Sequence, residues 1–314
     1  MTYQKERDLK TMAKLDIQVA ELPPFCSRFF IGIAQRTTPL TRLGYAVDLK
    51  KFFTYLRTEN EFFQELDITS IKPSDIETLT VHDIELYIAS MHDNGAAAKQ
   101  RKLCTLRSLF AYLFKVELIE KNIMPKVDLP RVKEKPITRL DKQEVSALLG
   151  TAELESNLRN ETMLVLFLST GIRVSELVGL NVSDIDIDKA SFRVTRKGGV
   201  ETILYLPEQC QEQLRTYLDE TKLEGPLFTN TTGRRLSVRA VQKIVRAYAS
   251  SAAPLKNISP HKLRSTFGTN LYHATGDIYV VADVLGHKDV NTTKKHYAAI
   301  TEDIRKEAAK SVKL

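Results

Sequence analysis

The residues best suited to chemistry lie in two places, one in the middle of the chain and one toward its C-terminal end. Arg173 stands in the first place and Arg264 in the second. A guanidinium is permanently charged and donates bidentate hydrogen bonds, so two arginines suit the two non-bridging oxygens of a phosphate. The second place also holds His261, His287 and Tyr297. Imidazole and phenol groups of this kind serve proton transfer and nucleophilic attack.

The elements that must position these groups are mostly helical. An apolar helix is predicted over 161–170, and it runs into a Gly-Ile-Arg turn that ends at Arg173. A further helix is expected from this turn through Leu180. Glu176 lies one helical turn after Arg173, where its carboxylate can orient that arginine or His261.

One β-hairpin is predicted within this helical pattern. Residues 191–195 and 202–206 are rich in β-branched and aromatic types, and a Lys-Gly-Gly turn separates them. Lys197 is therefore expected at the tip of the hairpin. Taken alone, Lys197 fits an ordinary exposed turn lysine better than a catalytic one, and Arg173 alone better fits a helix start and Tyr297 alone a core phenol.

Upstream, apolar residues recur at helical spacing. They predict helices that begin at Phe25, after a cap at Thr38 and after a cap at Thr80, followed by a helix over about 96–115. Asp141 is expected to cap another helix, which ends near Gly150.

The pattern divides the chain into domains. Residues 1–24 read as a mobile tail or a short helix, and 25–130 as a helical domain. Two prolines and several basic residues make 131–138 the expected linker. A second domain of mixed structure is expected over 139–297, with a tail over 298–314.

Composition limits the possible classes. The 314 residues are 43% hydrophobic and 27% charged, which is typical of a globular protein. The longest apolar run, Met163 to Leu168, is too short to span a bilayer, and the opening residues form no signal core. Three widely separated cysteines give neither metal spacing nor a disulfide framework, so we expect a cytoplasmic protein without a metal site.

The net charge of +7 permits an anionic partner. Basic residues gather on one face of the helix at 96–115, in the linker and on a helix that begins near Ser237, and each group reads either as a solvated surface or as a phosphate-contacting one. The candidate DNA-binding residues are Lys99, Arg101, Lys102, Arg107, Arg131, Lys133, Lys135, Arg239 and Lys243.

These features together resemble the tyrosine recombinase, or phage integrase, family, which includes Xer, Cre and lambda-type integrases. The resemblance covers nearly the whole chain. It rests on the order of Arg173, the hairpin lysine Lys197, the His261-x-x-Arg264 motif, the Leu-Gly-His motif that ends at His287, and Tyr297. Each motif is weak alone, whereas six in family order form a specific match.

The resemblance implies a mainly α fold with a small β-sheet: a C-shaped clamp of a helical, SAM-like core-binding domain and an α+β catalytic domain. It implies that Tyr297 attacks a DNA phosphate to form a 3′-phosphotyrosyl intermediate, which Arg173 and Arg264 stabilise. Lys197 would protonate the leaving 5′-oxygen, a task for which Arg196 is a poor substitute. His261 and His287 would handle protons or bind the phosphate. No cofactor is expected.

The implied partner is double-stranded DNA with a specific inverted-repeat site. The implied assembly is a homotetramer that exchanges tails and forms a Holliday junction, with a second recombinase or accessory factor as a further candidate partner. Two roles fit, Xer-like dimer resolution and integration or excision of a mobile element. The alternatives are a type IB topoisomerase-like relaxing enzyme and a catalytically inert DNA-binding regulator.

Overall fold

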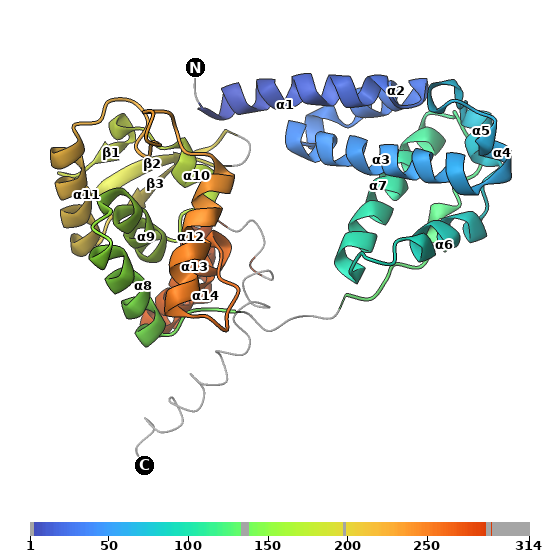
Figure 1. The fold of residues 1–314 in the computed structure, drawn as a ribbon. Coiled ribbons are helices and arrows are strands. Elements are labelled where there is room, and N and C mark those ends of the chain that lie inside the picture. Colours follow the sequence, from blue (N-terminus) through green and yellow to red (C-terminus); the bar gives the residue numbers. More distant parts are fainter. Residues whose placement is uncertain (1–2, 133–137, 197–198, 287–289, 291–314) are drawn as a thin grey trace, which may run out of the picture. The chain divides into compact units, whose positions relative to one another are not determined.

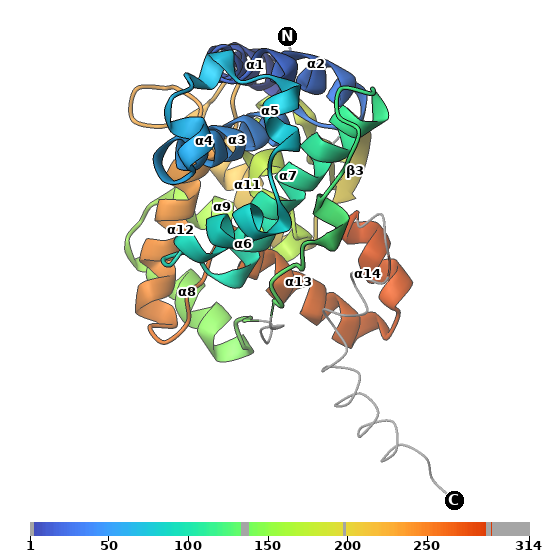
Figure 2. The same ribbon diagram turned by 90° about the vertical axis from the view of Figure 1, so that its right-hand side faces the viewer.

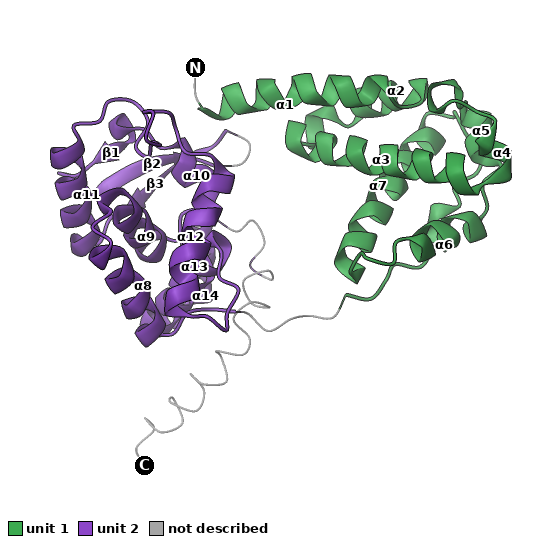
Figure 3. Ribbon diagram, in the orientation of Figure 1, with its two compact units in different colours: residues 1–134 green, residues 135–314 purple. Residues whose placement is uncertain are grey.

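The structure is a computed structural model that describes residues 3–132, 138–196, 199–286 and 290. The chain divides into two compact units, Met1–Glu134 and Lys135–Leu314 (Figure 3). This division falls inside the segment expected to be the linker. Within the described residues, no helix has the length and apolar character needed to cross a membrane.

Every regular element that the structure describes in the first unit is a helix (Figures 1 and 2). Its long helices are α1 (Tyr3–Ala20), α3 (Pro39–Glu59) and α7 (Ala96–Lys115). Shorter elements connect them: α2 (Pro24–Gly32), η1 (Ala34–Arg36), α4 (Glu61–Gln64), η2 (Ile68–Ser70), α5 (Pro73–Glu77), α6 (Val81–Ser90) and η3 (Met124–Lys126).

The predicted caps begin these helices. The Thr38 hydroxyl accepts a hydrogen bond from the Thr41 backbone N–H at 3.2 Å and so starts α3. At α6, Thr80 accepts from the Asp83 N–H, and the Asp83 carboxylate accepts in return from the Thr80 N–H at 2.8 Å. Such caps satisfy N–H groups that have no partner inside the helix.

Aromatic side chains fill the core of this unit. Phe29, Phe52, Phe53, Phe63 and Phe110 are all buried. α3 packs against α4 and α7, and α2 packs against α7, which brings these rings together. Bulky rings in edge-to-face contact bury much apolar surface per residue, so a small helical unit acquires its own core.

Helix α1 differs from the expectation of a mobile tail or a short helix. It is an 18-residue helix that packs against α3. Leu15 and, beyond the helix, Leu22 are buried in the aromatic core. Leu9, Met12 and Ile17 are exposed, so the apolar residues of α1 do not all lie on one buried face. The sequence of α1 therefore shows only a weak amphipathic pattern.

The second unit combines helices with one small sheet. Helix α9 (Leu158–Thr170) lies at its centre and packs against α8 (Lys142–Leu154), α11 (Glu208–Thr221) and α13 (Pro260–Thr275). The remaining elements are α10 (Val174–Gly179), η4 (Val182–Asp184), β1 (Ile185–Asp186), β2 (Ser191–Thr195), β3 (Glu201–Tyr205), α12 (Val238–Ala252) and α14 (Ile278–Leu285).

The sheet is antiparallel, in the order β1-β2-β3. Phe192 pairs with Leu204 and Val194 with Thr202, so the predicted hairpin is present. Phe192, Val194 and Leu204 are buried, whereas Ile203 and Tyr205 point to the exposed face. This alternation fixes the register, because a slip of one residue would expose the buried set.

The predicted cap at Asp141 is present, since its carboxylate accepts from the Glu144 N–H at 2.9 Å. Helix α8 runs past its expected end at Gly150 to Leu154, because Ala152 is buried in the core and prolongs the apolar face. The chain is thus mainly α with a small antiparallel sheet, as predicted.

Candidate functional site

Arg173 lies where the chain passes from α9 to α10. Gly171 ends α9 with a positive φ of 61°, and a Cβ on it would lie 2.3 Å from the ring of Phe267. A residue with a side chain would therefore be strained here and would also clash. The turn places Arg173 at the N-cap of α10.

Glu176 holds Arg173 from the first turn of α10. One carboxylate oxygen accepts from the Arg173 backbone N–H at 3.0 Å, and the other accepts from its Nη1 at 2.8 Å. The Glu176 side chain is 4% exposed and that of Arg173 is 35% exposed. A buried carboxylate thus restrains an arginine that remains accessible.

Arg264 meets Arg173 at the end of α14. Arg264 lies on α13, is 5% exposed, and donates to the backbone carbonyls of Gly171 and Leu285. Arg173 Nη2 donates to the same Leu285 carbonyl at 3.1 Å and to the Gly286 carbonyl at 2.9 Å. Two guanidinium groups from distant parts of the sequence therefore share one acceptor oxygen.

Arg196, directly after β2, joins the same helix end. Its Nη2 donates to the Val284 carbonyl at 2.8 Å. Carbonyls in the last turn of a helix lack intrahelical partners and carry the negative end of its dipole, so cations are favoured there. The C-terminal carbonyls of α14 thus gather Arg173, Arg196 and Arg264 into what we call the arginine cluster.

Arg196 is also affected by burial. Desolvation lowers the pKa of its guanidinium, and the charge of Arg173 lowers it further, while Glu176 and Asp283 act in the opposite direction. Gly286 has a φ of 60°, and a Cβ there would lie 2.0 Å from Arg196 Nη1. Glycine at this position lets the helix end approach the guanidinium closely.

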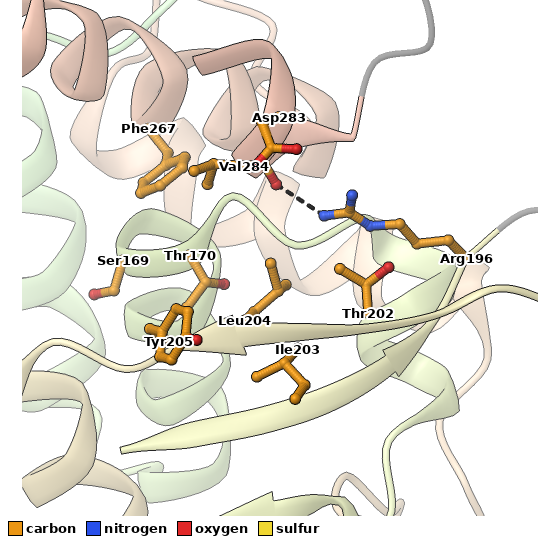
Figure 4. Close-up of a pocket in the computed structure, with 10 residues that line it drawn as sticks. All are labelled: Ser169, Thr170, Arg196, Thr202, Ile203, Leu204, Tyr205, Phe267, Asp283 and Val284. Atoms are coloured by element: carbon orange, nitrogen blue, oxygen red, sulfur yellow. Dashed lines mark hydrogen bonds between the residues drawn. The ribbon is translucent and has the colours of Figure 1, made fainter. Parts of the chain in front are cut away.

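A pocket of about 220 Å³ lies beside the cluster (Figure 4). Its wall includes Arg196, which Figure 4 shows bonded to Val284. The end of α9, strand β3, Phe267 and Asp283 complete the wall, whereas Arg173 and Arg264 do not contribute to it. The pocket is therefore adjacent to the candidate site and not identical with it.

The other candidate residues divide between described and undescribed positions. His261 lies in the first turn of α13, is exposed, and precedes Arg264 by three residues, which puts both on one side of the helix. Lys197, His287 and Tyr297 lie outside the described residues. In the chain, Lys197 directly follows Arg196 and His287 directly follows Gly286, so two of the three adjoin residues at the cluster.

No metal site emerges from the part of the chain that the structure describes, where His, Cys, Asp and Glu side chains do not gather in groups of three or more.

The candidate DNA-binding residues have different environments. Lys102 is buried and donates to Asn94 at 3.0 Å, and Arg107 donates to the Val127 carbonyl at 2.6 Å. Lys99 is half-buried, and Lys133 and Lys135 lie outside the described residues. The exposed members are Arg101, Arg131, Arg239 and Lys243.

Two residues of interest escape sequence reasoning. The sequence marks Arg196 only as a poor proton donor, yet it is the third member of the arginine cluster. Asp48, on α3, is 2% exposed and pairs with Arg101. Its only sequence signal is a carboxylate among apolar helix positions, which indicates a buried partner without naming it.

The comparisons with known proteins cover nearly the whole chain. Residues 138–303 match the Phage integrase family, and residues 27–116 match the Phage integrase, N-terminal SAM-like domain. Tyrosine recombinase XerC of Pelobacter propionicus is 30% identical over 275 residues, 86% of this chain and 88% of the relative. Tyrosine recombinase XerD of Staphylococcus saprophyticus is 31% identical over 288 residues, 88% of this chain and 94% of the relative.

Solved structures share the fold. XerH site-specific recombinase bound to palindromic difH substrate is 22% identical with a TM-score of 0.65, covering 88% of this chain and 81% of that one. A lambda integrase tetramer bound to a Holliday junction is 20% identical with a TM-score of 0.69, covering 86% and 75%. The chain therefore belongs to the phage integrase family of tyrosine recombinases, and it is an enzyme that breaks and rejoins DNA.

Proposed function

We propose that this enzyme is a site-specific recombinase that exchanges DNA strands through a 3′-phosphotyrosyl intermediate. The observation that carries the proposal is the convergence of Arg173 and Arg264 on a single acceptor oxygen, the Leu285 carbonyl. Glu176 holds Arg173 there by accepting a hydrogen bond from its guanidinium. Two positive charges around one oxygen position form a site for an anion with several oxygens, and a phosphodiester is such an anion.

The nucleophile in this proposal is Tyr297. Its phenolate oxygen forms a bond to phosphorus while the bond from phosphorus to the 5′-oxygen breaks, so the phosphodiester energy is conserved. A free phenol has a pKa of about 10, so loss of its proton needs a base and a cationic surrounding. His261 accepts protons in this scheme, His287 donates a hydrogen bond to the phosphate, and Lys197 protonates the leaving 5′-oxygen.

Arg173 and Arg264 act on the charge that develops at phosphorus. In the structure they donate to neutral backbone carbonyls. A phosphate oxygen is a stronger acceptor than a carbonyl because it is charged. The carbonyls hold both guanidinium groups at one place, so the exchange of a carbonyl for a phosphate oxygen needs only a local change in each arginine, which favours electrostatic catalysis.

Strand exchange then follows from reversal of the first step. The 5′-hydroxyl of a second duplex attacks the phosphotyrosyl bond and releases Tyr297, which joins strands from different duplexes and forms a Holliday junction. We infer an inverted-repeat site and a tetramer whose 298–314 tails dock between protomers. Support comes from solved relatives, one bound to a palindromic substrate and one a tetramer on a Holliday junction.

Deleting residues from Thr301 onward tests the assembly. The truncated protein is expected to bind a single duplex site with parental affinity and to lose synapsis of two sites, measured by gel shift with one and two labelled duplexes. Equal loss of both activities would contradict docking by the tail.

The central experiment needs no known target. The protein, its Tyr297→Phe variant and a Tyr279→Phe control are incubated with nicked, fragmented host DNA, denatured, and analysed for protein-linked DNA. Tyr279 is an exposed tyrosine on α14 and serves as the matched control. Adducts with the parent and the control, and none with Tyr297→Phe, are expected.

The trapped DNA ends also discriminate the roles. Ends that map to one chromosomal site favour dimer resolution, whereas ends at the borders of an inserted element favour integration and excision. Adducts scattered without a common sequence favour a relaxing enzyme of the topoisomerase IB type. Binding without adducts in all three proteins favours an inert regulator and would overturn the proposal.

A further inference from the structure

A buried carboxylate in the first unit holds an exposed arginine. Asp48 lies on the core side of α3, and Arg101 lies on α7, which packs against α3. One Asp48 oxygen accepts from Arg101 Nη2 at 2.7 Å, and the other accepts from Nη1. The Thr105 hydroxyl donates to the same carboxylate at 3.2 Å, so the acceptor is itself fixed.

The pair is asymmetric in its exposure. The side chain of Asp48 is 2% exposed, whereas that of Arg101 is 55% exposed. Asp48 occupies one edge of the planar guanidinium through both terminal nitrogens. The other edge, formed by Nε and one terminal nitrogen, has no partner among the described residues and retains donors in a fixed fork.

Packing alone does not account for this arrangement. Burying a carboxylate lowers the stability of the fold, and a half-exposed ion pair offsets only part of this loss. An apolar residue at position 48 would therefore give a more stable core. The Asp48 carboxylate instead fixes the direction of an accessible guanidinium. A restrained arginine loses little side-chain entropy when it binds, which favours selective recognition.

Arg101 is one of several cations near Lys102, its neighbour in the sequence. Burial lowers the pKa of Lys102, and the positive charges of Lys51, Arg101 and Lys99 lower it further, while Asp48 opposes them. Lys51, on α3, is exposed and was not among the sequence candidates. Lys51, Lys99, Arg101 and Lys102 form what we call the α3–α7 basic patch.

We propose that Arg101 is a specificity-determining residue that reads a guanine in the major groove, and that Asp48 is its positioning residue. The inference rests on the proposed site-specific function and deepens it. A fixed guanidinium fork matches the O6 and N7 acceptors that guanine presents in the major groove, and no other base presents two acceptors there. Lys51, which is exposed, and Lys99, which is half-buried, contact phosphates, which position the protein without reading sequence.

The test selects binding sites from a random duplex pool with the full-length protein. Four proteins are compared: the parent, Arg101→Lys, Asp48→Asn, and Lys51→Gln as the control from the same patch. Affinity for a selected site, for its variant at the guanine step and for unrelated DNA is then measured at several salt concentrations. Thermal unfolding by circular dichroism verifies that each variant is folded.

Arg101→Lys is expected to lose the preference for guanine at one step of each half-site by about 5- to 100-fold, with unchanged affinity for unrelated DNA, because the charge stays and the fork is lost. Asp48→Asn is expected to lose the same preference while its affinity for unrelated DNA stays equal or rises, because a negative charge leaves the patch. If Asp48 had only a structural role, Asp48→Asn would instead lower the affinity for both the selected and the unrelated DNA.

Lys51→Gln is expected to keep the selected sequence and bind all DNA more weakly, with a smaller salt dependence.

The outcomes separate this inference from the proposed function. If Arg101→Lys selects the parental sequence with parental discrimination, Arg101 does not read a base, and the site-specific function stands. If Asp48→Asn retains the full preference, Asp48 is not its positioning residue. A parent that enriches no sequence would overturn the site-specific function and this inference together.

Discussion

Replacing Glu176 with glutamine tests whether the arginine cluster needs its buried carboxylate. Glu176 accepts from the Arg173 backbone N–H and from Nη1, one bond to each oxygen. A glutamine keeps one oxygen and replaces the other with an NH2 group, which would face an N–H donor. One of the two bonds is therefore lost, and the negative charge beside the guanidinium is lost with it.

The magnitude follows from the kind of bond. A hydrogen bond to a charged group contributes about 1.5–3 kcal/mol. The Arg173 side chain is 35% exposed and regains some hydration, so we expect a loss of about 2 kcal/mol in the free energy of unfolding. Loss of one oriented transition-state donor slows reactions by roughly 100- to 1,000-fold, and a donor that is only loosened should cost roughly 10- to 100-fold.

Glu144→Gln is the matched control. Glu144 also accepts from the backbone N–H of a helix cap, at Asp141, and it also pairs with a cation, Lys256. It belongs to α8 and not to the arginine cluster. Both variants are compared by urea unfolding and by the rate of covalent adduct formation on a trapped target site.

Both bonds of Glu144 go to one oxygen, which glutamine keeps, so we expect Glu144→Gln to lose less stability than Glu176→Gln. We expect a slower adduct rate only in Glu176→Gln. If Glu176→Gln forms adducts at the rate of the Glu144→Gln control, Glu176 is an ordinary helix cap and its orienting role is refuted.

Three further predictions concern other groups. Arg196→Ala removes the bond to the Val284 carbonyl, so adduct formation should slow by about tenfold while DNA affinity in a gel shift stays unchanged; a parental rate would show that Arg196 has no positioning role. Iodoacetamide should label Cys104 alone in the native protein, since Cys104 is exposed whereas burial raises the pKa of Cys26 and raises that of Cys210 to about 12. DNA should protect Cys104, which lies one turn from Arg101, and labelling of all three thiols without denaturant would contradict the burial. Burial lowers the pKa of Lys102 below its ordinary 10.5, so the unfolded state binds more protons in the window between the two values. Stability should therefore rise with pH up to 10.5, and Lys102→Met should reduce that slope in urea unfolding; identical slopes would exclude the effect.

Local signals made part of this fold predictable from the sequence. Helix α7 spans the predicted 96–115, and the caps at Thr38, Thr80 and Asp141 start the helices they were expected to start. A cap and a periodic apolar face lie within a few residues of each other, so one sequence is enough to find them. Helix α1 lacked this signal, because its anchor is Leu15 together with residues beyond the helix.

Within the described part of the candidate site, the sequence singled out Arg173, Glu176 and Arg264, but it did not indicate the backbone acceptors that join the two arginines. The pairing of Arg173 with Glu176 follows from helical spacing, and its convergence with Arg264 was implied by the family resemblance. The acceptors at the end of α14 could not be predicted, because every residue carries a backbone carbonyl and the sequence does not mark the one that is used. Arg196 escaped attention for this reason.

The carbonyls at the end of α14 also affect how this enzyme tolerates mutation. A carbonyl oxygen belongs to the main chain, so substitution at Val284 or Leu285 leaves the acceptors of the three arginines in place provided that the helix survives. Gly286 is the exception, because any side chain there would displace Arg196. A deep mutational scan is therefore expected to find that the arginine cluster tolerates substitutions along α14 and does not tolerate them at the glycine that ends this helix.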